Sequence, residues 1–413
     1  MRRRSFAKVL RDNRGSIAVH LGLLIFFLIG FTALGTELVS VILVHRRMQS
    51  AADAAAMNGA MAIATGYPAS PVSESKATTA SMGFVDGQNA TTITATVGPT
   101  SGPHIGDTKY IEVIVDRIQP LGLISVFGIP SYDLRVRAVA TTVTEGVACV
   151  LGLDTGLSQT VLVNNNGVLA NPNCGVVVNS NAPDALTVEN GASITGPVSV
   201  TGGWLLANNG TLNNPHNISG AAPVADPYAG VSIGTVPACT VQSGTVNNNQ
   251  TVGLTPGHFC AGFNLKNRAT ANLSAGTYYI DSQLIMGTNA ILNAPSGSTL
   301  VINGNYAVQF GSGAQLTIVA PTTGNFAGLA MYSSRTATSS IVQDFKNNMT
   351  VTITGALYFP NQILDLAPGT LVGATVCTQI VARVVRVYNN AYLNNNCAGI
   401  GASIGYVIPQ LTE

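Results

Sequence analysis

The pattern of hydrophobic and polar positions begins with one long apolar segment. Residues 16–36 contain no Asp, Glu, Lys or Arg, and the apolar run resumes after Glu37 as far as Val44. At ~1.5 Å per residue, the uncharged part alone is roughly 30 Å long as a helix, which is the thickness of one hydrocarbon core. The pattern therefore predicts a transmembrane α-helix over residues 15–44.

A cleaved secretory signal is the alternative for this segment. Its apolar region would be shorter, about 7–15 residues, and a small-residue cleavage site would follow closely. Here the run is longer and ends at His45-Arg46-Arg47, so we favour a retained anchor. Residues 1–14 form a basic tail with six basic residues and one acidic residue. The positive-inside rule therefore places this tail in the cytoplasm and the bulk of the chain outside.

Glu37 is the one acid within the apolar stretch and lies near its outer end. An unpaired carboxylate in lipid would cost several kcal/mol. Two interpretations stay open: the side chain reaches the outer interface, or it pairs with another membrane helix. The Ala-rich segment 45–66 should continue the helix outward, because alanine is the strongest helix former. Gly66 and Pro68 should end it.

Residues 67–146 show shorter, strand-like patterns. Three strands are expected from runs of β-branched residues: Thr91–Val97, Tyr110–Val115 and Leu134–Val143. Residues 121–127 should form a short helix or turn that packs on the sheet. Arg135 and Arg137 alternate with apolar positions, so we expect them on a solvated strand face. The region is predicted to be a small α+β stalk domain.

The remainder, residues 147–413, is dominated by Asn, Gly, Thr, Ser and Val. Short β-branched runs alternate with Asn/Gly-rich corners, as where Val161-Leu162-Val163 precedes Asn164-Asn165-Asn166-Gly167. Asn and Gly tolerate left-handed backbone angles, and strands this short are typical of coils stacked at ~4.8 Å. With coils of ~20–25 residues, the pattern predicts a mainly-β right-handed parallel β-helix (solenoid) of around ten turns. A β-sandwich is the alternative.

All six cysteines lie in this last region: Cys149, Cys174, Cys239, Cys260, Cys377 and Cys397. They lack the Cys-x-x-Cys spacing of a zinc or redox motif and fit disulfides in an oxidising compartment better. Sequential pairs are separated by about one coil, so their disulfides would join neighbouring coils and contribute about 3 kcal/mol each. Six cysteines allow fifteen pairings, and free buried thiols are the other interpretation.

Composition and charge exclude several classes of protein. With 9% charged residues, 44 glycines and a net charge of +1, a disordered chain, a coiled coil and a highly charged nucleic-acid binder are excluded. Polysaccharide lyases and hydrolases need clustered carboxylates, and we recognise no two acids beyond residue 147 at a spacing that places them on adjacent turns. We therefore predict no enzyme, no cofactor and no metal. His258 is expected to pack beside a disulfide, since it precedes Phe259-Cys260.

The N-terminal segment carries a family resemblance. Arg14-Gly15-Ser16-Ile17-Ala18-Val19, a long apolar run with one acid, and then Arg46-Arg47-Met48-Gln49-Ser50-Ala51-Ala52-Asp53 resemble the N-terminal segment of TadG-like proteins. The resemblance implies a single-pass envelope protein of the Tad machinery that assembles Flp pili. Related pseudopilins are cut after a glycine and have Glu as the fifth mature residue. Counted from Gly15 that position is His20, so we expect the tail to be retained.

Together with the predicted anchor, topology and solenoid, the resemblance implies a non-enzymatic envelope protein of Tad/Flp pilus assembly or anchoring in the bacterial inner membrane, with most of the chain in the periplasm. The expected partners are the lipid bilayer and other Tad/Flp pilus-assembly proteins, with no nucleic acid. A polysaccharide-binding or adhesive rod that contacts cell-wall or surface polysaccharide is the alternative, and a polysaccharide lyase or hydrolase is less favoured. The expected boundaries are 1–14 tail, 15–44 membrane helix, 45–66 helical extension, 67–146 stalk and 147–413 β-helix.

Overall fold

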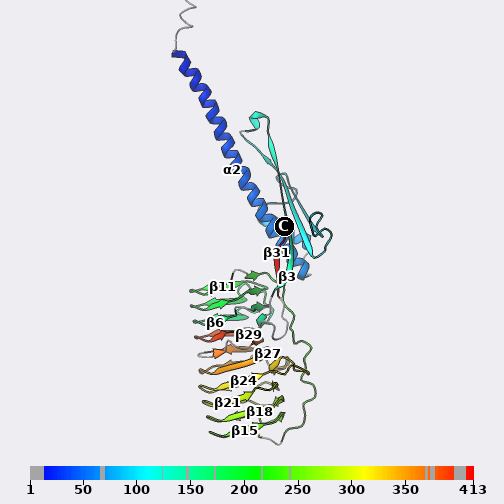
Figure 1. Cartoon of the computed structure of the whole chain (residues 1–413), viewed down its shortest axis with the longest axis vertical. Helices are drawn as coiled ribbons and strands as arrows, with labels where there is room; N and C mark the ends of the chain where they lie inside the picture. Colours follow the sequence, from blue (N-terminus) through cyan, green and yellow to red (C-terminus); the bar gives the residue numbers. More distant parts are fainter. Residues whose placement is uncertain are drawn as a thin grey trace, which may run out of the picture. The chain divides into compact units, whose positions relative to one another are not determined.

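Figure 1 shows a computed structural model of the chain, which divides into two compact units: residues 1–143 with 409–413, and residues 144–408. The structure describes residues 14–65, 70–122, 124–145, 148–171, 174–214, 217–240, 243–367, 371–372, 377–394 and 406–413. The predicted basic tail lies outside the described residues except for Arg14. We describe each unit by itself.

A single helix, α2 (Arg14–Thr65, 52 residues), spans both the predicted membrane helix and its Ala-rich extension. Its first part exposes apolar side chains, such as Phe27 (61% exposed) and Phe31 (71%). Its last part buries a small-residue face against a sheet: Met48, Ala51, Ala52, Ala55, Ala56 and Ala60. Within the described residues, no helix combines the length and apolar character required of a membrane span.

The sheet of the first unit has the order β1-β2-β3-β31. Its strands are β1 (Thr91–Val97), β2 (Tyr110–Pro120), β3 (Ser131–Glu145) and β31 (Tyr406–Leu411). β1 pairs with β2 and β2 with β3, both antiparallel. Ile93, Ile111, Val113 and Val115 pack on the alanine face of α2. This is the predicted small α+β domain, in which β2 and β3 extend beyond their predicted ends to form a long hairpin.

A second helix, α3 (Pro71–Ser81), was not expected from the sequence. Its residues are mostly small and polar, so they show no apolar face that repeats with the period of a helix. Ser70 caps it by accepting a hydrogen bond from the Ser73 backbone N–H (3.2 Å), with Pro71 at the first helical position. α3 packs closely on α2: a Cβ on Gly59 would lie 2.3 Å from Ser75 Oγ. The glycine is therefore required for the contact between the helices.

The end of the chain completes this sheet. β31 lies next to β3, and the Glu413 carbonyl accepts a hydrogen bond from the Val139 N–H at 3.1 Å. The chain thus leaves the first unit after β3 and returns to it at residue 409. The second unit is an insertion between two neighbouring strands, and residues 409–413, which we had expected in the β-helix, belong to the first unit.

A buried ion pair holds the two long strands together. Glu112 in β2 is 1% exposed and accepts hydrogen bonds from Arg137 Nε in β3 (2.5 Å) and from the Thr100 N–H (3.0 Å). Burial alone would raise the pKa of Glu112, but the hydrogen bonds from Thr100 and Arg137 outweigh it and hold the pKa below its ordinary value. Arg137 also binds the Glu413 carboxylate.

The expectation of a solvated face is therefore wrong for Arg137, whose guanidinium bridges two carboxylates. Arg135 does lie on such a face: its side chain is 67% exposed beside Asp116. The alternation of basic and apolar residues in β3 could not show which arginine is bound by carboxylates, because the carboxylates lie on β2 and at the end of the chain.

The second unit is a β-solenoid of about ten turns. Its strands contain two to five residues in most cases: β4 (Ala148–Gly152), β5 (Val161–Asn164), β6 (Val168–Ala170), β7 (Gly175–Val178), β8 (Leu186–Glu189), β9 (Ser193–Thr195), β10 (Val198–Val200), β11 (Trp204–Ala207), β12 (Thr211–Leu212), β13 (Ile218–Ser219), β14 (Thr245–Val246), β15 (Thr251–Leu254), β16 (Gly257–Phe259), β17 (Phe263–Leu265), β18 (Thr270–Leu273), β19 (Gly276–Ile280), β20 (Leu284–Met286), β21 (Ile291–Ala294), β22 (Ser298–Ile302), β23 (Val308–Phe310), β24 (Gln315–Val319), β25 (Leu329–Ser333), β26 (Val342–Phe345), β27 (Thr350–Leu366), β28 (Leu371–Val372), β29 (Thr378–Tyr388) and β30 (Tyr392–Asn394).

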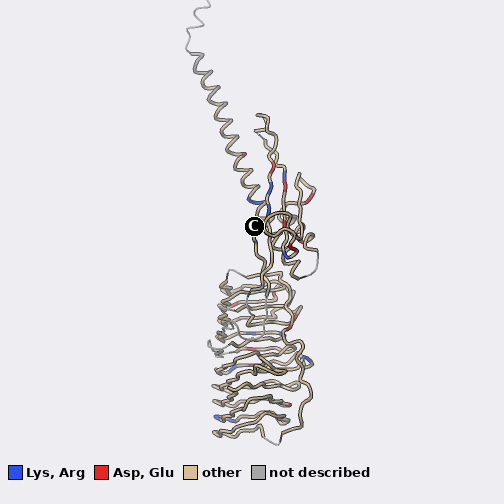
Figure 2. The backbone as a smooth tube through the Cα atoms, turned by 45° about the vertical axis from the view of Figure 1, so that its right-hand side comes forward, with Lys and Arg blue, Asp and Glu red and all other residues tan. Residues whose placement is uncertain are grey.

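Parallel pairing between successive turns defines the architecture. For example, Val176 in β7 pairs with Val198 in β10, and Tyr278 in β19 pairs with Leu300 in β22. Among the described residues every named strand pairing of this unit is parallel, which excludes the β-sandwich alternative. Figure 2 shows that charged residues are sparse along these turns. The right-handed sense stays a prediction.

Asparagines form the corners, as the sequence predicted. Asn165, Asn190, Asn208 and Asn389 all have positive φ values, between 46° and 56°, a region that Asn tolerates better than other non-glycine residues. Their side chains also bond from turn to turn: Asn165 Nδ2 donates to Asn389 Oδ1 (3.1 Å), and Asn208 Nδ2 donates to Asn190 Oδ1 (2.9 Å). The corner residues therefore both permit the bend and connect neighbouring turns.

The order of the turns in the stack differs from their order in the sequence (Figure 1). The chain builds turns from β4 to β13, crosses to the opposite end between β13 and β14, and builds the remaining turns from β14 to β30. β29 then pairs with both β4 and β5, with Ile380 opposite Val150 and Val385 opposite Val161. The solenoid therefore begins and ends in the interior of its own stack.

Replacing Arg137 with Met should destabilise the first unit by about 2–3 kcal/mol, because Glu112 would be left buried without its charge partner. Hydrogen exchange of the β2 and β3 amides in the full chain measures this change. Arg135→Met is the matched control, for which less than about 1 kcal/mol is expected, since its ion pair is exposed. Equal exchange rates in the two variants would contradict the assigned role of Arg137.

Candidate functional site

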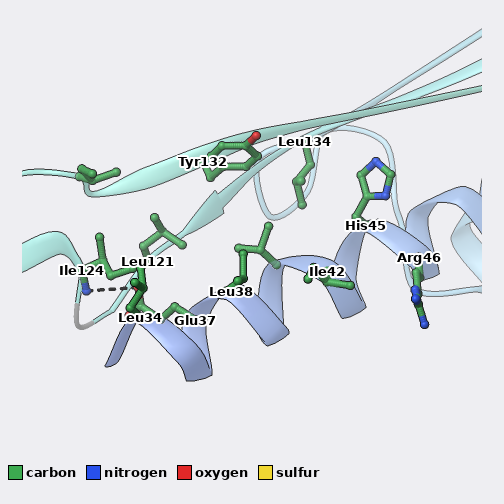
Figure 3. A pocket seen from close by; sticks show the side chains of 12 residues that line it. Leu34, Glu37, Leu38, Ile42, His45, Arg46, Leu121, Ile124, Tyr132 and Leu134 are labelled. Atoms are coloured by element: carbon green, nitrogen blue, oxygen red, sulfur yellow. Dashed lines mark hydrogen bonds between the residues drawn. The ribbon is translucent and has the colours of Figure 1, made fainter. Parts of the chain in front are cut away.

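An apolar groove with a volume of about 550 Å³ lies between α2 and the connection from β2 to β3 (Figure 3). α2 contributes Leu34, Leu38 and Ile42, and the hairpin contributes Leu121, Ile124 and Tyr132 on the other side. His45 and Arg46 line the groove at the end that lies further along α2. The groove is therefore lined mostly by apolar side chains, with His45 and Arg46 at one end.

Glu37 connects the two walls of this groove. Its carboxylate accepts a hydrogen bond from the backbone N–H of Ile124 at 3.2 Å. Ile124 begins η1 (Ile124–Phe127), a single 3-10 turn, so the carboxylate satisfies one of the free N–H groups at its start. Residues 121–127 were expected to pack on the sheet; Ile124, in their described part, contacts α2 through Glu37, and packing on the sheet stays a prediction. Pairing of Glu37 with another membrane helix stays a prediction.

The described cysteines of the second unit are all disulfide-bonded. Cys149 in β4 forms a disulfide with Cys174, which precedes β7, and β4 and β7 are paired strands. Cys239 forms a disulfide with Cys260 at the end of β16. Cys377 is also disulfide-bonded, and its predicted partner Cys397 lies outside the described residues. No cysteine in the described part of the chain is a free thiol.

The segment that crosses between the two ends of the solenoid, residues 220–240, is called the strap here. Its backbone is bound by side chains from turns far apart in the sequence. Asn179 exchanges two hydrogen bonds of 2.8 Å with the backbone of Val224, and the Tyr332 hydroxyl donates to the Val231 carbonyl at 3.1 Å. At its end, Cys239 forms a parallel bridge with His258. The strap is thus fixed along its length.

A polar cluster binds the strap to the turns of the solenoid and is centred on Asp226 of the strap. Its carboxylate accepts hydrogen bonds from the Tyr358 hydroxyl and from Arg335 Nη2, both at 2.8 Å. The guanidinium of Arg335 also lies 5.3 Å from the centre of the Tyr358 ring. Burial, and then the hydrogen bond to Asp226, raise the pKa of Tyr358, so its hydroxyl stays protonated. These groups bind one another and hold the strap.

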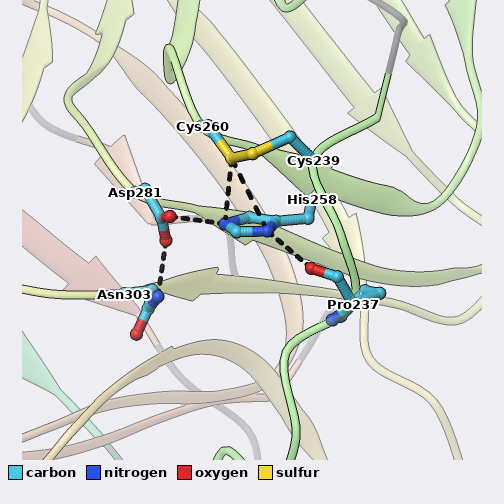
Figure 4. The surroundings of a disulfide bond; sticks show 6 residues. All are labelled: Pro237, Cys239, His258, Cys260, Asp281 and Asn303. Atoms are coloured by element: carbon cyan, nitrogen blue, oxygen red, sulfur yellow. Dashed lines mark hydrogen bonds and ion pairs between the residues drawn. A yellow bond between two sulfur atoms is a disulfide. The ribbon is translucent and has the colours of Figure 1, made fainter.

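His258 lies directly beside the disulfide at the far end of the strap (Figure 4). Its Nε2 is 2.5 Å from Asp281 Oδ2, its Nδ1 is 2.7 Å from the Pro237 carbonyl, and Cys260 Sγ is 3.4–3.6 Å from both ring nitrogens. The predicted packing of His258 beside a disulfide is therefore confirmed. Cys239, His258 and Cys260 gather ligand-type atoms within 4.8 Å, but both sulfurs are bonded to each other and are not thiolates.

Two acids of the solenoid lie on adjacent turns, so our statement that none could be recognised there is corrected. Asp344 in β26 pairs with Asp365 in β27, which pairs with Arg386 in β29. Each is separated from the next by the length of one turn, and this repeated spacing is the signal that the sequence analysis missed. Asp365 is 7% exposed. Burial raises its pKa, against the opposing charge of Arg386 and the hydrogen bond from Tyr388.

Such a pair resembles part of an acid–base site, since two carboxyl groups lie on adjacent turns and one of them is buried. The neighbouring side chains, however, already bind one oxygen of each carboxylate: Lys346 pairs with Asp344 Oδ2, and the Tyr388 hydroxyl donates to Asp365 Oδ2 at 3.3 Å. Burial also raises the pKa of Tyr388 to about 12, so it stays a donor. The arrangement is that of a structural polar column.

The architecture defines a class of protein: a β-solenoid inserted into a small α+β domain that is built on one long, partly apolar helix. Residues 15–62 match the Tad family model, described as "Putative Flp pilus-assembly TadE/G-like". The chain therefore carries a TadE/G-like domain within α2. Neither the curated proteins nor the solved structures provide a match to the chain.

Asp365→Asn should raise the free energy of unfolding at about pH 7, because the native protein then no longer buries an ionised carboxylate. The folded-state pKa lies above the ordinary value of 3.8, so stability from this group is present below that value and is lost as the pH rises through the folded-state pKa. The gain should therefore disappear in acid. Urea midpoints followed by Trp204 fluorescence measure it.

Asp344→Asn is the control for this comparison. Its partner Lys346 is exposed, so the midpoint should change little at either pH. A midpoint that falls equally at both pH values in Asp365→Asn would contradict the assigned effect of burial.

Proposed function

We propose that this protein is a non-enzymatic component of Tad/Flp pilus assembly or anchoring in the bacterial envelope. The observation that carries the proposal is the TadE/G-like match over residues 15–62. This segment includes the apolar part of α2 and most of the alanine face that packs into the first unit. The residues that match the family model and the residues that pack into the first unit therefore lie on the same helix, α2.

In this proposal, the apolar part of α2 crosses the inner membrane once, with the basic tail in the cytoplasm. The support is the exposed surface of the helix before the groove, which carries these large apolar side chains: Leu21, Leu24, Phe27, Leu28 and Phe31. A continuous apolar surface of this kind is unfavourable in water and favourable in lipid. Glu37 follows directly at the outer end of the uncharged run.

The periplasmic placement of both folded units is supported by the disulfides. Bonds such as Cys149–Cys174 and Cys239–Cys260 are typical of proteins that fold in an oxidising compartment. The solenoid then projects a nearly uncharged surface of amides and hydroxyls. Such a surface is suited to docking with other assembly proteins and poorly suited to electrostatic capture of a charged ligand.

A clean in-frame deletion tests this proposal, with surface pili counted by electron microscopy. We expect pili to be lost, to return with the full-length chain, and not to return when residues 1–44 are replaced by a cleaved secretory signal. The basis of the last expectation is that an unanchored chain would diffuse away from the membrane assembly. The Arg135→Met chain is the complementation control, since that side chain is exposed.

The outcomes separate the parts of the proposal. Unchanged pili in the deletion strain would overturn the assembly role and leave binding of polysaccharide by the full chain as the function to test. Restoration of pili by the unanchored chain would instead overturn the anchor and keep the assembly role.

A further inference from the structure

The described part of the connection between β2 and β3, with the adjoining strand ends, exposes several large apolar side chains. From Pro120 to Tyr132 the sequence contains no charged residue. Ile118, Ile129 and Tyr132 are 50%, 52% and 55% exposed. Connections between strands usually carry Gly, Asn, Asp and Ser and face water. We call the set Ile118, Leu121, Ile124, Ile129 and Tyr132 the apolar tip; its exposed members need a partner of low polarity.

Glu37 determines the position of the apolar tip along the axis of α2. The tip is bound there by the hydrogen bond from the Ile124 N–H to the Glu37 carboxylate. Glu37 is also the first charged residue after the uncharged run of residues 16–36. The apolar tip therefore lies beside the point at which the hydrocarbon-length segment of the helix ends.

Polar and aromatic groups follow in the order found at a bilayer surface. Tyr132 faces the groove beside Leu38, and His45 and Arg46 line its further end. Arg46 lies nine residues beyond Glu37, about 13 Å along a helix axis, and is exposed. Apolar residues at depth, a tyrosine above them and the Arg46 cation at the level of lipid phosphates are the arrangement of an interfacial segment.

We propose that the apolar tip inserts into the outer-leaflet interface of the bilayer, so that the protein binds the membrane through the hairpin as well as through α2. The partner is the lipid surface itself. This inference rests on the proposed function, because it requires α2 to cross the same bilayer. Two contacts, joined by Glu37, would restrict rotation and tilt of the first unit relative to the membrane, which a single helix leaves free.

Depth-dependent quenching in proteoliposomes tests this inference with the full-length protein. An NBD fluorophore is attached to Ile129→Cys, and lipids with a nitroxide at a shallow or a deep acyl position act as quenchers. Insertion by roughly 5–10 Å predicts about threefold stronger quenching by the shallow than by the deep nitroxide. Thr94→Cys, exposed on β1 of the same unit, is the matched control and should not respond. Tyr132→Cys provides a second tip position.

A probe at Phe27→Cys, on the exposed apolar surface of α2, distinguishes the two proposals. Quenching at Phe27 without quenching at Ile129 and Tyr132 would overturn the interfacial tip and leave the anchor intact. Loss of quenching at Phe27 would overturn the anchor. A tip probe that is shielded from both lipid nitroxides and aqueous iodide would indicate that a protein surface covers the tip, which also contradicts this inference.

Discussion

The pairing of β29 with β4 and β5 is the constraint on which the second unit depends. It places the last turns of the solenoid against the first, with Ile380 opposite Val150 and Val385 opposite Val161. Both ends of the inserted chain therefore leave from the interior of the stack, and β3 and β31, to which they connect, are neighbours in one sheet. An ordinary solenoid, with its ends at opposite extremes, would require a much longer return.

This closure makes the strap necessary, because the chain must travel from β13 to the opposite end of the stack before it builds β14. A long connection of this kind is costly in conformational entropy unless it is bound. Asn179, Tyr332 and the Asp226 cluster bind its backbone and side chains, and the Cys239–Cys260 disulfide fixes its end. The disulfides thus serve two purposes: one joins neighbouring turns, and one fastens the strap.

Local features of the fold were predictable from the sequence, whereas long-range ones were not. The short strands and Asn corners follow from β-branched runs and from Asn165 and Asn190 in left-handed conformations. α3 was signalled by Ser at the N-cap, Pro at the first helical position and an acid in the first turn, Ser70-Pro71 with Glu74, which hydropathy does not reveal. In contrast, nothing near Glu37 indicates Ile124, 87 residues away, and parallel pairing of β29 with β4 leaves no local pattern. The alignment of Asp344, Asp365 and Arg386 on successive turns was predictable in principle, because they are separated by one turn each.

The order of the turns is the central structural claim, and a single engineered cross-link tests it most directly. Arg386 and Leu162 are paired in register on the outward side of β29 and β5, within the separation that a disulfide requires. Cysteines at both positions of the full-length protein should form a bond under mild oxidation, detectable by peptide mass spectrometry. A reference pair at Leu162 and Thr187, on the consecutive turns of β5 and β8, should also form. Formation of the reference bond alone would contradict the permuted stack.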